Sequence, residues 1–489
     1  MVKWKQENQL PLVDNFSSFP FMGEGKYIKE ALQMKKLVSL VLALLMVFSI
    51  TASLAEIVPT TEEITLTYAD CGEDLELTMA LADQFMKQYP NIKVEIIDLA
   101  PGFLNTGYDT AIGNLASTQD LPDVFWVTRV TDAVGNEWCI NLDKYYAEDP
   151  DAALIHDSIL DANLIAGKRY SVPAQSRPYM MLINKTLFDQ YNVPMPEYTW
   201  SWEEFKDLAL ELNHPEDMVT GYGNATTCDA FIPMYGWDGE SYTVGDLYIE
   251  TEEMFAEWRL TRVSDGFVGP EKEALFGDPN VQLFNVGHAC MNAGDLLWGG
   301  TQYIDGTLAA ELGCEFEVYP VPTPHEAAMD NMFFACIAAS CEHPDEAWLL
   351  AKWMTWGKEA TMLRNQWFHD EEVLQISLPM IDDAEVKQHA IDCADPALKN
   401  FFMYSKPTMP MAAPHAPGFQ DCNVQYFNVE NLQNRFAAGE VSPSDVADSL
   451  REKFNFFRDR WFAQNPEVAP EGFTGAVTPT DLATGTDAQ

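Results

Sequence analysis

Histidine, serine, cysteine and acidic side chains all occur in this 489-residue chain, but not at the spacing of a catalytic motif. There is no G-x-S-x-G turn, no G-x-x-x-x-G-K-[ST] phosphate loop and no dinucleotide-binding glycine fingerprint. The pair His325-Glu326 lacks the second histidine of an H-E-x-x-H zinc site. Carboxylate pairs are numerous, yet a glycosidase needs two of them facing each other at a defined separation. The motifs therefore favour a protein that is not an enzyme, and a glycoside-active enzyme is the weaker alternative.

The cysteines do not form a recognisable site. They are odd in number and scattered, with no C-x-x-C pair and no histidine at ligand spacing, so neither a zinc site nor a disulfide scaffold is supported. We expect most of them to be small buried apolar residues, with one or two disulfides left open, and we expect no metal and no cofactor. The nine are Cys71, Cys139, Cys228, Cys290, Cys314, Cys336, Cys341, Cys393 and Cys422.

The composition limits the class of partner. Asp and Glu number 75 against 29 Lys and Arg, which gives a formal net charge of −46. A surface this negative repels phosphate backbones and anionic membranes, so we exclude nucleic acid as a partner. Hydrophobic residues make up 47% of the chain, enough for a folded core, and the length favours more than one domain. The acidic surface keeps an exported protein soluble; steering of cationic solutes is the alternative interpretation.

The first part of the chain has the pattern of an export signal. Met34-Lys35-Lys36 is basic, residues 37–50 are apolar, and Ala52-Ser53-Leu54-Ala55 offers small residues before Glu56. We therefore predict a signal peptide at residues 34–55 and an extracytoplasmic location; an uncleaved anchor is the alternative. There is no lipoprotein cysteine at this junction.

Neither end of the chain, before the signal peptide or after residue 464, has the sequence pattern of a folded segment. Residues 1–33 carry acidic groups ahead of the signal, which is unusual, and we interpret them as a non-native upstream extension; an extended n-region of the signal is the alternative. Residues 465–489 are rich in Pro, Thr, Ala and Gly without apolar periodicity, which predicts a flexible tail.

Strands and helices alternate through the first part of the mature chain. Ile64, Leu66 and Tyr68 alternate with threonines, which is typical of a strand, and an amphipathic helix is predicted over residues 74–88. Two further strands are predicted at residues 92–96 and 123–127, with a helix near residues 109–117 between them; the whole pattern indicates an α/β fold with parallel strands and crossover helices.

A series of short motifs then carries a family resemblance over roughly residues 62–462. The chain resembles the family 1 extracellular solute-binding proteins of bacterial ABC importers, the group that includes maltose-binding protein, with Ile183 and Ser201 as mild departures. The matching segments are Tyr89-Pro90-Asn91-Ile92-Lys93-Val94 after Phe85, Pro122-Asp123-Val124-Phe125, Gly167-Lys168-Arg169-Tyr170-Ser171-Val172-Pro173, Leu182 to Phe188, Ser201-Trp202-Glu203-Glu204-Phe205, Phe284 to Met291, Pro344 to Trp348 and Gly439 to Pro443.

The resemblance implies a periplasmic-binding-protein-like fold: two lobes, each a central sheet flanked by helices, joined by a hinge of several segments. The crossings are expected near Ala174–Pro178, Tyr319–Thr323 and Phe402–Lys406. One lobe then takes residues 56–176 and 322–402, and the other takes residues 177–321 and 403–464.

The resemblance also implies a function. Such a protein captures a carbohydrate, an oligosaccharide by preference, between its lobes and delivers it to the transmembrane subunits of an ABC permease. The chain would act as a monomer. A polyamine or peptide bound by the same fold is the alternative, which a carboxylate-rich groove with few aromatic faces would favour.

Candidate ligand contacts combine aromatic faces for sugar rings with polar groups for hydroxyls, at strand ends or at the hinge. Burial in a lobe is the competing interpretation for each aromatic residue, and turn or cap chemistry for each aspartate. Arg177 could instead pair structurally with a carboxylate. The candidates are Tyr68, Asp70, Trp126, Arg129, Arg177, Tyr179, Trp237, Asp238, Asp295, Trp298 and His415, with Phe419 weaker.

Overall fold

The structure is a computed structural model of the whole chain, and its described part excludes the predicted upstream extension and signal peptide. Of the predicted tail, residues 476–489 also lie outside it. The described residues are 57–71, 74–99, 107–162, 164–223, 230–295, 301–325, 327–375, 377–411, 415–425, 432, 435–436 and 438–475.

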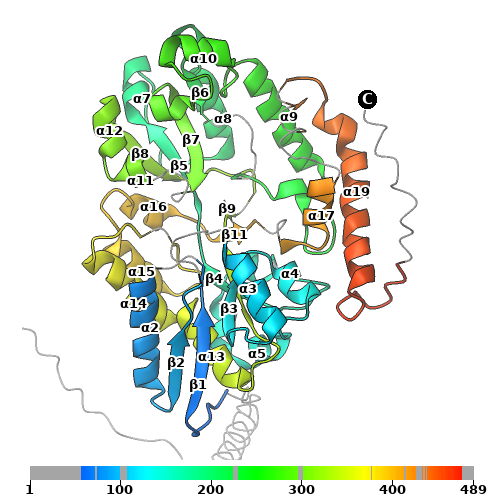
Figure 1. Ribbon diagram of the computed structural model, residues 1–489. Coiled ribbons are helices and arrows are strands. Elements are labelled where there is room, and N and C mark those ends of the chain that lie inside the picture. The colour runs from blue at the N-terminus through cyan, green and yellow to red at the C-terminus, as the bar shows by residue number, and fades with distance from the viewer. Residues whose placement is uncertain are drawn as a thin grey trace, which may run out of the picture. The chain divides into compact units, whose positions relative to one another are not determined.

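The first lobe is built on a five-stranded sheet in the order β2-β1-β3-β10-β4 (Figure 1). β1 pairs in parallel with both β2 and β3, whereas β10 runs antiparallel to β3 and β4. The burial of β1 alternates along most of its length, as its sequence predicts, and β3 is buried throughout. The strands are β1 (Ile64–Ala69), β2 (Ile92–Ile96), β3 (Val124–Val127), β4 (Val172–Gln175) and β10 (Phe333–Ile337).

Helices cover this sheet and share one apolar core with it. Asp74 caps α2 by accepting from the backbone N–H of Glu76, and α2 buries Leu77, Leu81 and Phe85 against the sheet. The helices of this part are α2 (Leu75–Gln88), α3 (Gly107–Thr118), α4 (Val130–Gly135), α5 (Asp143–Glu148), α6 (Asp157–Leu160), α13 (Pro344–Met354) and α14 (Lys358–Asp370), with a 3₁₀ turn at Pro150–Leu154.

The second lobe has a four-stranded sheet in the order β6-β7-β5-β8. β5 lies at its centre, antiparallel to β7 and β8, and every residue of β5 after Tyr179 is buried. The strands are β5 (Tyr179–Asn184), β6 (Thr220–Tyr222), β7 (Ala289–Asp295) and β8 (Phe316–Pro320), and the helices are α7 (Lys185–Tyr191), α8 (Trp202–Glu211), α9 (Asp246–Leu260), α10 (Gly269–Phe276), α11 (Thr301–Ile304), α12 (Thr307–Leu312) and α17 (Phe419–Gln425).

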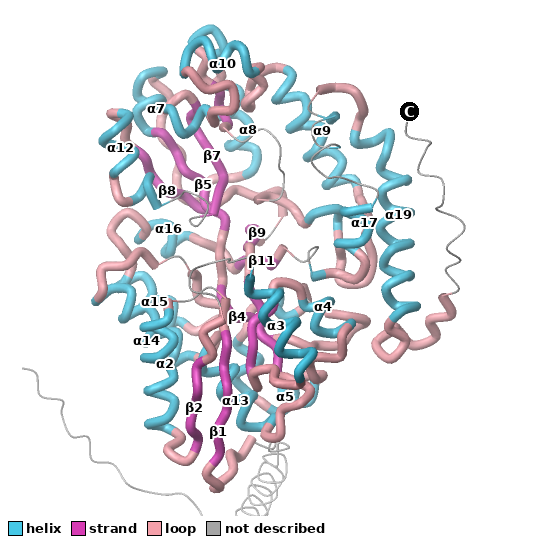
Figure 2. The backbone as a smooth tube through the Cα atoms, in the orientation of Figure 1, coloured by secondary structure: helices cyan, strands magenta, loops and turns pink. Residues whose placement is uncertain are grey.

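Three segments of the described chain lie between the two sheets and are called the crossing segments here (Figure 2). Only residues 176–178 separate β4 from β5, and residues 321–332 lead from β8 to β10. The second segment contains β9 (Ala328–Asp330), which pairs in parallel with β11 (Thr408–Pro410) of the third. The α/β fold with two lobes is confirmed, and the short antiparallel and parallel pairings keep the crossing segments in register.

The later helices pack in ways that the sequence did not indicate. α15 (Ala384–Cys393) and α16 (Lys399–Tyr404) share an apolar cluster with β5 and β8 of the second sheet. α19 (Pro443–Gln464) packs along the second lobe but ends with Phe462 in the first core. Val468 is also buried in that core, and the Phe473 ring lies 5.7 Å from Phe462, so this start of the predicted tail is packed. The exact lobe limits stay a prediction.

Candidate ligand-binding site

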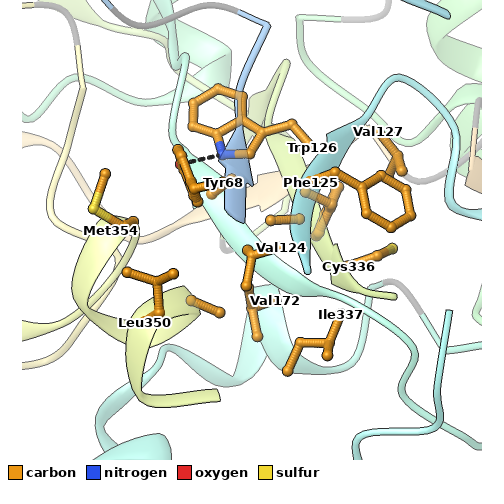
Figure 3. Packing of buried hydrophobic residues seen from close by; sticks show 14 of the residues in the cluster. Tyr68, Val124, Phe125, Trp126, Val127, Val172, Cys336, Ile337, Leu350 and Met354 are labelled. Carbon is orange, nitrogen blue, oxygen red and sulfur yellow. Dashed lines mark hydrogen bonds between the residues drawn. The ribbon is translucent and has the colours of Figure 1, made fainter. Parts of the chain in front are cut away.

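Two of the predicted aromatic residues, Tyr68 and Trp126, are buried beneath the carboxyl ends of β1 and β3. The indole N–H of Trp126 donates to the Tyr68 hydroxyl at 2.7 Å, and both side chains are fully buried (Figure 3). The Trp126 ring also stacks on Phe333, with 5.7 Å between centroids. Their faces are therefore occupied by the core, and they position the residues that follow them.

Asp70 and Cys71 lie just beyond β1. The hydroxyl of Thr78 donates to Asp70 at 2.9 Å and fixes that carboxylate. Burial raises the pKa of the Cys71 thiol to about 12; the charge of Asp70 adds to this, while the charge of Arg177 opposes it. The electrostatic coupling places Asp70, Cys71 and Arg177 in one neighbourhood at the strand ends.

Arg177 occupies the first crossing and is only 2% exposed. Its Nε and Nη2 each donate to the side-chain oxygen of Gln175 at 3.1 Å, and its guanidinium lies 4.2 Å from the centroid of the Phe333 ring. These contacts hold a planar cation in one orientation, which suits it to bond a ligand's hydroxyls or carboxylate.

Tyr179 and Asp295 lie opposite each other where the second sheet meets the crossing. They are register partners on β5 and β7, and Tyr179 is half-buried. The Asp295 side chain and all of Trp298 lie outside the described part of the chain, so these two candidates stay predictions.

Arg129 and His415 form the side of the site toward α4. Arg129 pairs with Asp132 at 2.7 Å, and the backbone N–H of Val130 donates to Nδ1 of His415 at 3.3 Å. Burial, with the nearby charge of Arg129, lowers the pKa of His415 to about 4. The imidazole is therefore neutral. Its hydrogen bond with the backbone of Val130 attaches the loop that contains His415 to the first lobe.

A cavity of about 260 Å³ opens beside Arg129. Its walls come from α3, the end of β3 and α4, and Asp109 accepts a hydrogen bond from the Thr128 hydroxyl inside it at 2.9 Å. Sequence reasoning missed Asp109; its place in the first turn of α3, directly beside the strand ends, was the available signal.

Trp237 and Asp238 have structural partners in the second lobe. The Trp237 ring is buried 4.7 Å from that of Tyr242. One oxygen of Asp238 accepts the backbone N–H groups of Glu240 and Ser241, which is typical of a turn. Phe419 is likewise buried, stacked on Phe454. Their role as ligand contacts stays a prediction.

Asp330 is a second residue that sequence reasoning missed. Its carboxylate accepts from the Ser176 hydroxyl at 2.5 Å, the Arg177 backbone N–H at 2.6 Å and the Thr408 hydroxyl at 2.7 Å. One buried side chain therefore ties all three crossing segments together. Nothing local in Met329-Asp330-Asn331 indicates this, because its partners lie 78 to 154 residues away.

A family comparison can now be set beside this geometry. The model of the bacterial extracellular solute-binding protein family matches residues 72–355, more than half of the chain. The chain belongs to this family. Its members bind solutes and catalyse no reaction, so this solute-binding protein is not an enzyme.

Solved structures show the same fold at low identity. A sugar transporter from Rhizobium etli in an open conformation is 18% identical, with a TM-score of 0.61, covering 80% of this chain and 99% of its own. An extracellular solute-binding protein from Staphylococcus aureus in complex with maltose is 14% identical, with a TM-score of 0.57 and coverages of 80% and 96%. A cyclic α-maltosyl-1,6-maltose binding protein from Arthrobacter globiformis is 16% identical, with a TM-score of 0.56 and coverages of 81% and 98%. No curated protein matches.

The described part of this solute-binding protein lacks two other features. None of its helices combines the length and apolar character needed to cross a bilayer. Nor does it gather three or more His, Cys, Asp or Glu side chains as a metal site would. The eight cysteines it describes are all free thiols.

Proposed function

We propose that this solute-binding protein captures a carbohydrate between its lobes and delivers it to the transmembrane subunits of an ABC permease. The observation that carries the proposal is the position of Arg177 and Tyr179. They lie on the segment that connects the two sheets, with Asp70 and Arg129 at the strand ends of the first lobe. In open α/β sheets, ligands bind at the carboxyl ends of strands, where such groups converge.

Carbohydrate is the favoured ligand for two reasons. One solved structure with this fold is a complex with maltose and another is of a cyclic α-maltosyl-1,6-maltose binding protein, although the low identity shows the fold alone. The side chains at the site also suit hydroxyls, since Arg177 donates and Asp70 accepts. Tyr179 adds a partly exposed ring.

The proposed ligand contacts are Asp70, Arg129, Arg177, Tyr179, Asp295 and Trp298. We propose that three buried residues hold these contacts in position: Tyr68, Trp126 and His415. Trp237 and Asp238 would join them only on lobe closure, because a ligand between two lobes contacts both when they close.

The location and partner belong to the same proposal. Export through a signal peptide at residues 34–55 would place the folded part, as a monomer, outside the cytoplasm. There the permease would distinguish loaded from empty protein by lobe orientation.

A thermal-shift panel tests the ligand class. Oligosaccharides at 100-fold excess over Kd should stabilise the native state by about 2.7 kcal/mol, because they bind the folded form only. Arg177→Gln should reduce that shift, whereas Arg435→Gln, a matched change at a half-exposed residue with an ion pair to Glu440, should leave it unchanged.

The same panel includes polyamines and short peptides, which the net charge of −46 favours as alternatives. A shift with polyamines and none with any glycan would overturn the carbohydrate assignment. Equal loss of the glycan shift in both arginine variants would remove Arg177 from the site.

A further inference from the structure

A large cavity lies beside the crossing segments and away from α3 and α4. It has a volume of about 590 Å³, within the range of small-molecule sites. In Figure 1, α16 lies to the left of the β4–β5 crossing, whereas α3 and α4 lie to its right. Of the candidate ligand contacts described above, only Tyr179 also lines this cavity.

All three crossing segments contribute to its wall. Pro178 and Tyr179 come from the first, residues 320–324 and Ala328 from the second, and residues 404–406 and Thr408 from the third. The start of α8 completes the wall, where Ser201 and Glu204 form a capping box that fixes the first turn. A ligand held here would contact every element that must move when the lobes reorient.

Aromatic rings line one side of the cavity. Tyr198 stacks on Tyr319 at 4.2 Å and on Tyr404 at 5.6 Å, with interplanar angles of 11° and 10°. This stack of three tyrosine rings runs from β8 to α16, and Tyr404, at the α16 end of the stack, is 42% exposed. Trp202, half-buried, adds a second aromatic surface. Rings presented in this way suit the apolar CH face of a sugar or another flat apolar group.

The polar groups of the lining are balanced in charge. Two lysines, Lys206 and Lys406, stand with two carboxylates, Glu203 and Glu250, although the whole chain carries a net charge of −46. A lining with no net charge selects neither a cation nor an anion, whereas its donors and acceptors serve neutral hydroxyls. Ser405 also lines the cavity, and its Oγ is buried with no hydrogen-bond partner among the described residues.

We propose that this cavity is a second binding site of the protein, which takes a neutral saccharide of one or two rings. It shares only Tyr179 with the proposed contacts of the site at the strand ends and does not depend on which solute is transported. Because its walls include all three crossing segments, the affinities of the two sites are coupled through the lobe orientation that each ligand favours.

Calorimetric titration with maltose and with cellobiose tests the proposal. The wild type should bind at least one of them at two sites per chain. Tyr404→Ala should weaken one site about tenfold, the usual effect of truncating a central aromatic contact, and leave the other present. Lys406→Ala should weaken the same site, and Arg177→Gln should weaken the other.

Met403→Ala is the matched control, because Met403 is 45% exposed on the same helix and does not line the cavity. Circular dichroism melting of each variant separates lost binding from lost folding. One site per chain, sensitive to Arg177→Gln but not to Tyr404→Ala or Lys406→Ala, would overturn the second site and leave the proposed function intact. A single site sensitive only to the Tyr404 and Lys406 changes would instead overturn the strand-end site.

Discussion

At the scale of single residues, Asp330 combines two opposing effects on one carboxylate. Its complete burial raises the pKa to about 6, and the hydrogen bonds from Ser176, Thr408 and Arg177, with the charge of Arg177, oppose that rise. The nearest charged group to face it is Arg177, from the first crossing; Ser176 and Thr408 are neutral donors. The carboxylate thus sets how firmly the crossing segments are joined.

The raised pKa predicts a specific pH dependence. In the unfolded chain an aspartate titrates near 3.9, so between about pH 4 and pH 6 the folded state binds the proton more tightly. The contribution of Asp330 to stability is therefore present below the unfolded pKa and is lost as pH rises through about 6. Urea unfolding of the wild type should show a loss of about 3 kcal/mol from this group, and Asp330→Asn should not.

The control for that measurement is Asp207→Asn, at an exposed position on α8. It should keep the wild-type slope of unfolding free energy against pH. An unchanged slope in Asp330→Asn would show that the carboxylate is not the titrating group.

At the scale of elements, the segment around Gly418 is pressed against α19. Gly418 has a φ of +75°, and a Cβ there would lie 2.2 Å from the backbone carbon of Phe457. Only a residue without a side chain allows this approach. The contact joins the loop of His415 to the long helix that reaches both cores.

Gly418→Ala should therefore destabilise the protein by more than about 2 kcal/mol, since backbone must shift to relieve the overlap. Gly472→Ala is the matched control: its φ is +81°, but no atom lies within 4 Å of the added Cβ. It should cost only about 1 kcal/mol, from the left-handed backbone alone. Equal midpoints in a thermal melt of both variants would contradict the close packing against α19.

Local sequence patterns were sufficient for many of the elements. The predicted strands at residues 92–96 and 123–127 correspond to β2 and β3, and Ser201 and Glu204 have the spacing of the capping box that begins α8. Ser442 precedes α19, which begins at Pro443, but its side chain does not cap that helix. Its hydroxyl donates to Glu253 of α9. The Ser442 side chain is therefore oriented by a carboxylate of a distant helix and not by the backbone N–H groups of α19.

Contacts between distant segments could not be predicted in the same way. β10 enters the first sheet antiparallel, about 200 residues after its neighbour β3, although the local alternation of strands and helices indicated parallel pairing. The hydrogen bonds of Asp330 and the lining of the cavity beside α16 likewise depend on contacts between segments that are far apart in the sequence. Within the candidate site, the residue types could be predicted from the sequence. The burial of Tyr68 and Trp126 could not, because it depends on tertiary packing that the spacing of residues along the chain does not determine.

At the scale of the whole molecule, the central claim is that two lobes close around a bound carbohydrate. The crossing segments are short, and a single carboxylate ties them, so a change of lobe orientation concentrates in a few residues. A ligand that contacts both lobes shifts the population toward the closed state by its differential affinity.

Small-angle X-ray scattering of the purified protein, with and without the oligosaccharide that gives the largest thermal shift, tests this claim most directly. The account predicts a smaller radius of gyration in the saturated sample, and a reduced response in Arg177→Gln at the same saccharide concentration. A radius unchanged at saturation, or one reduced by polyamines and by no saccharide, would contradict it.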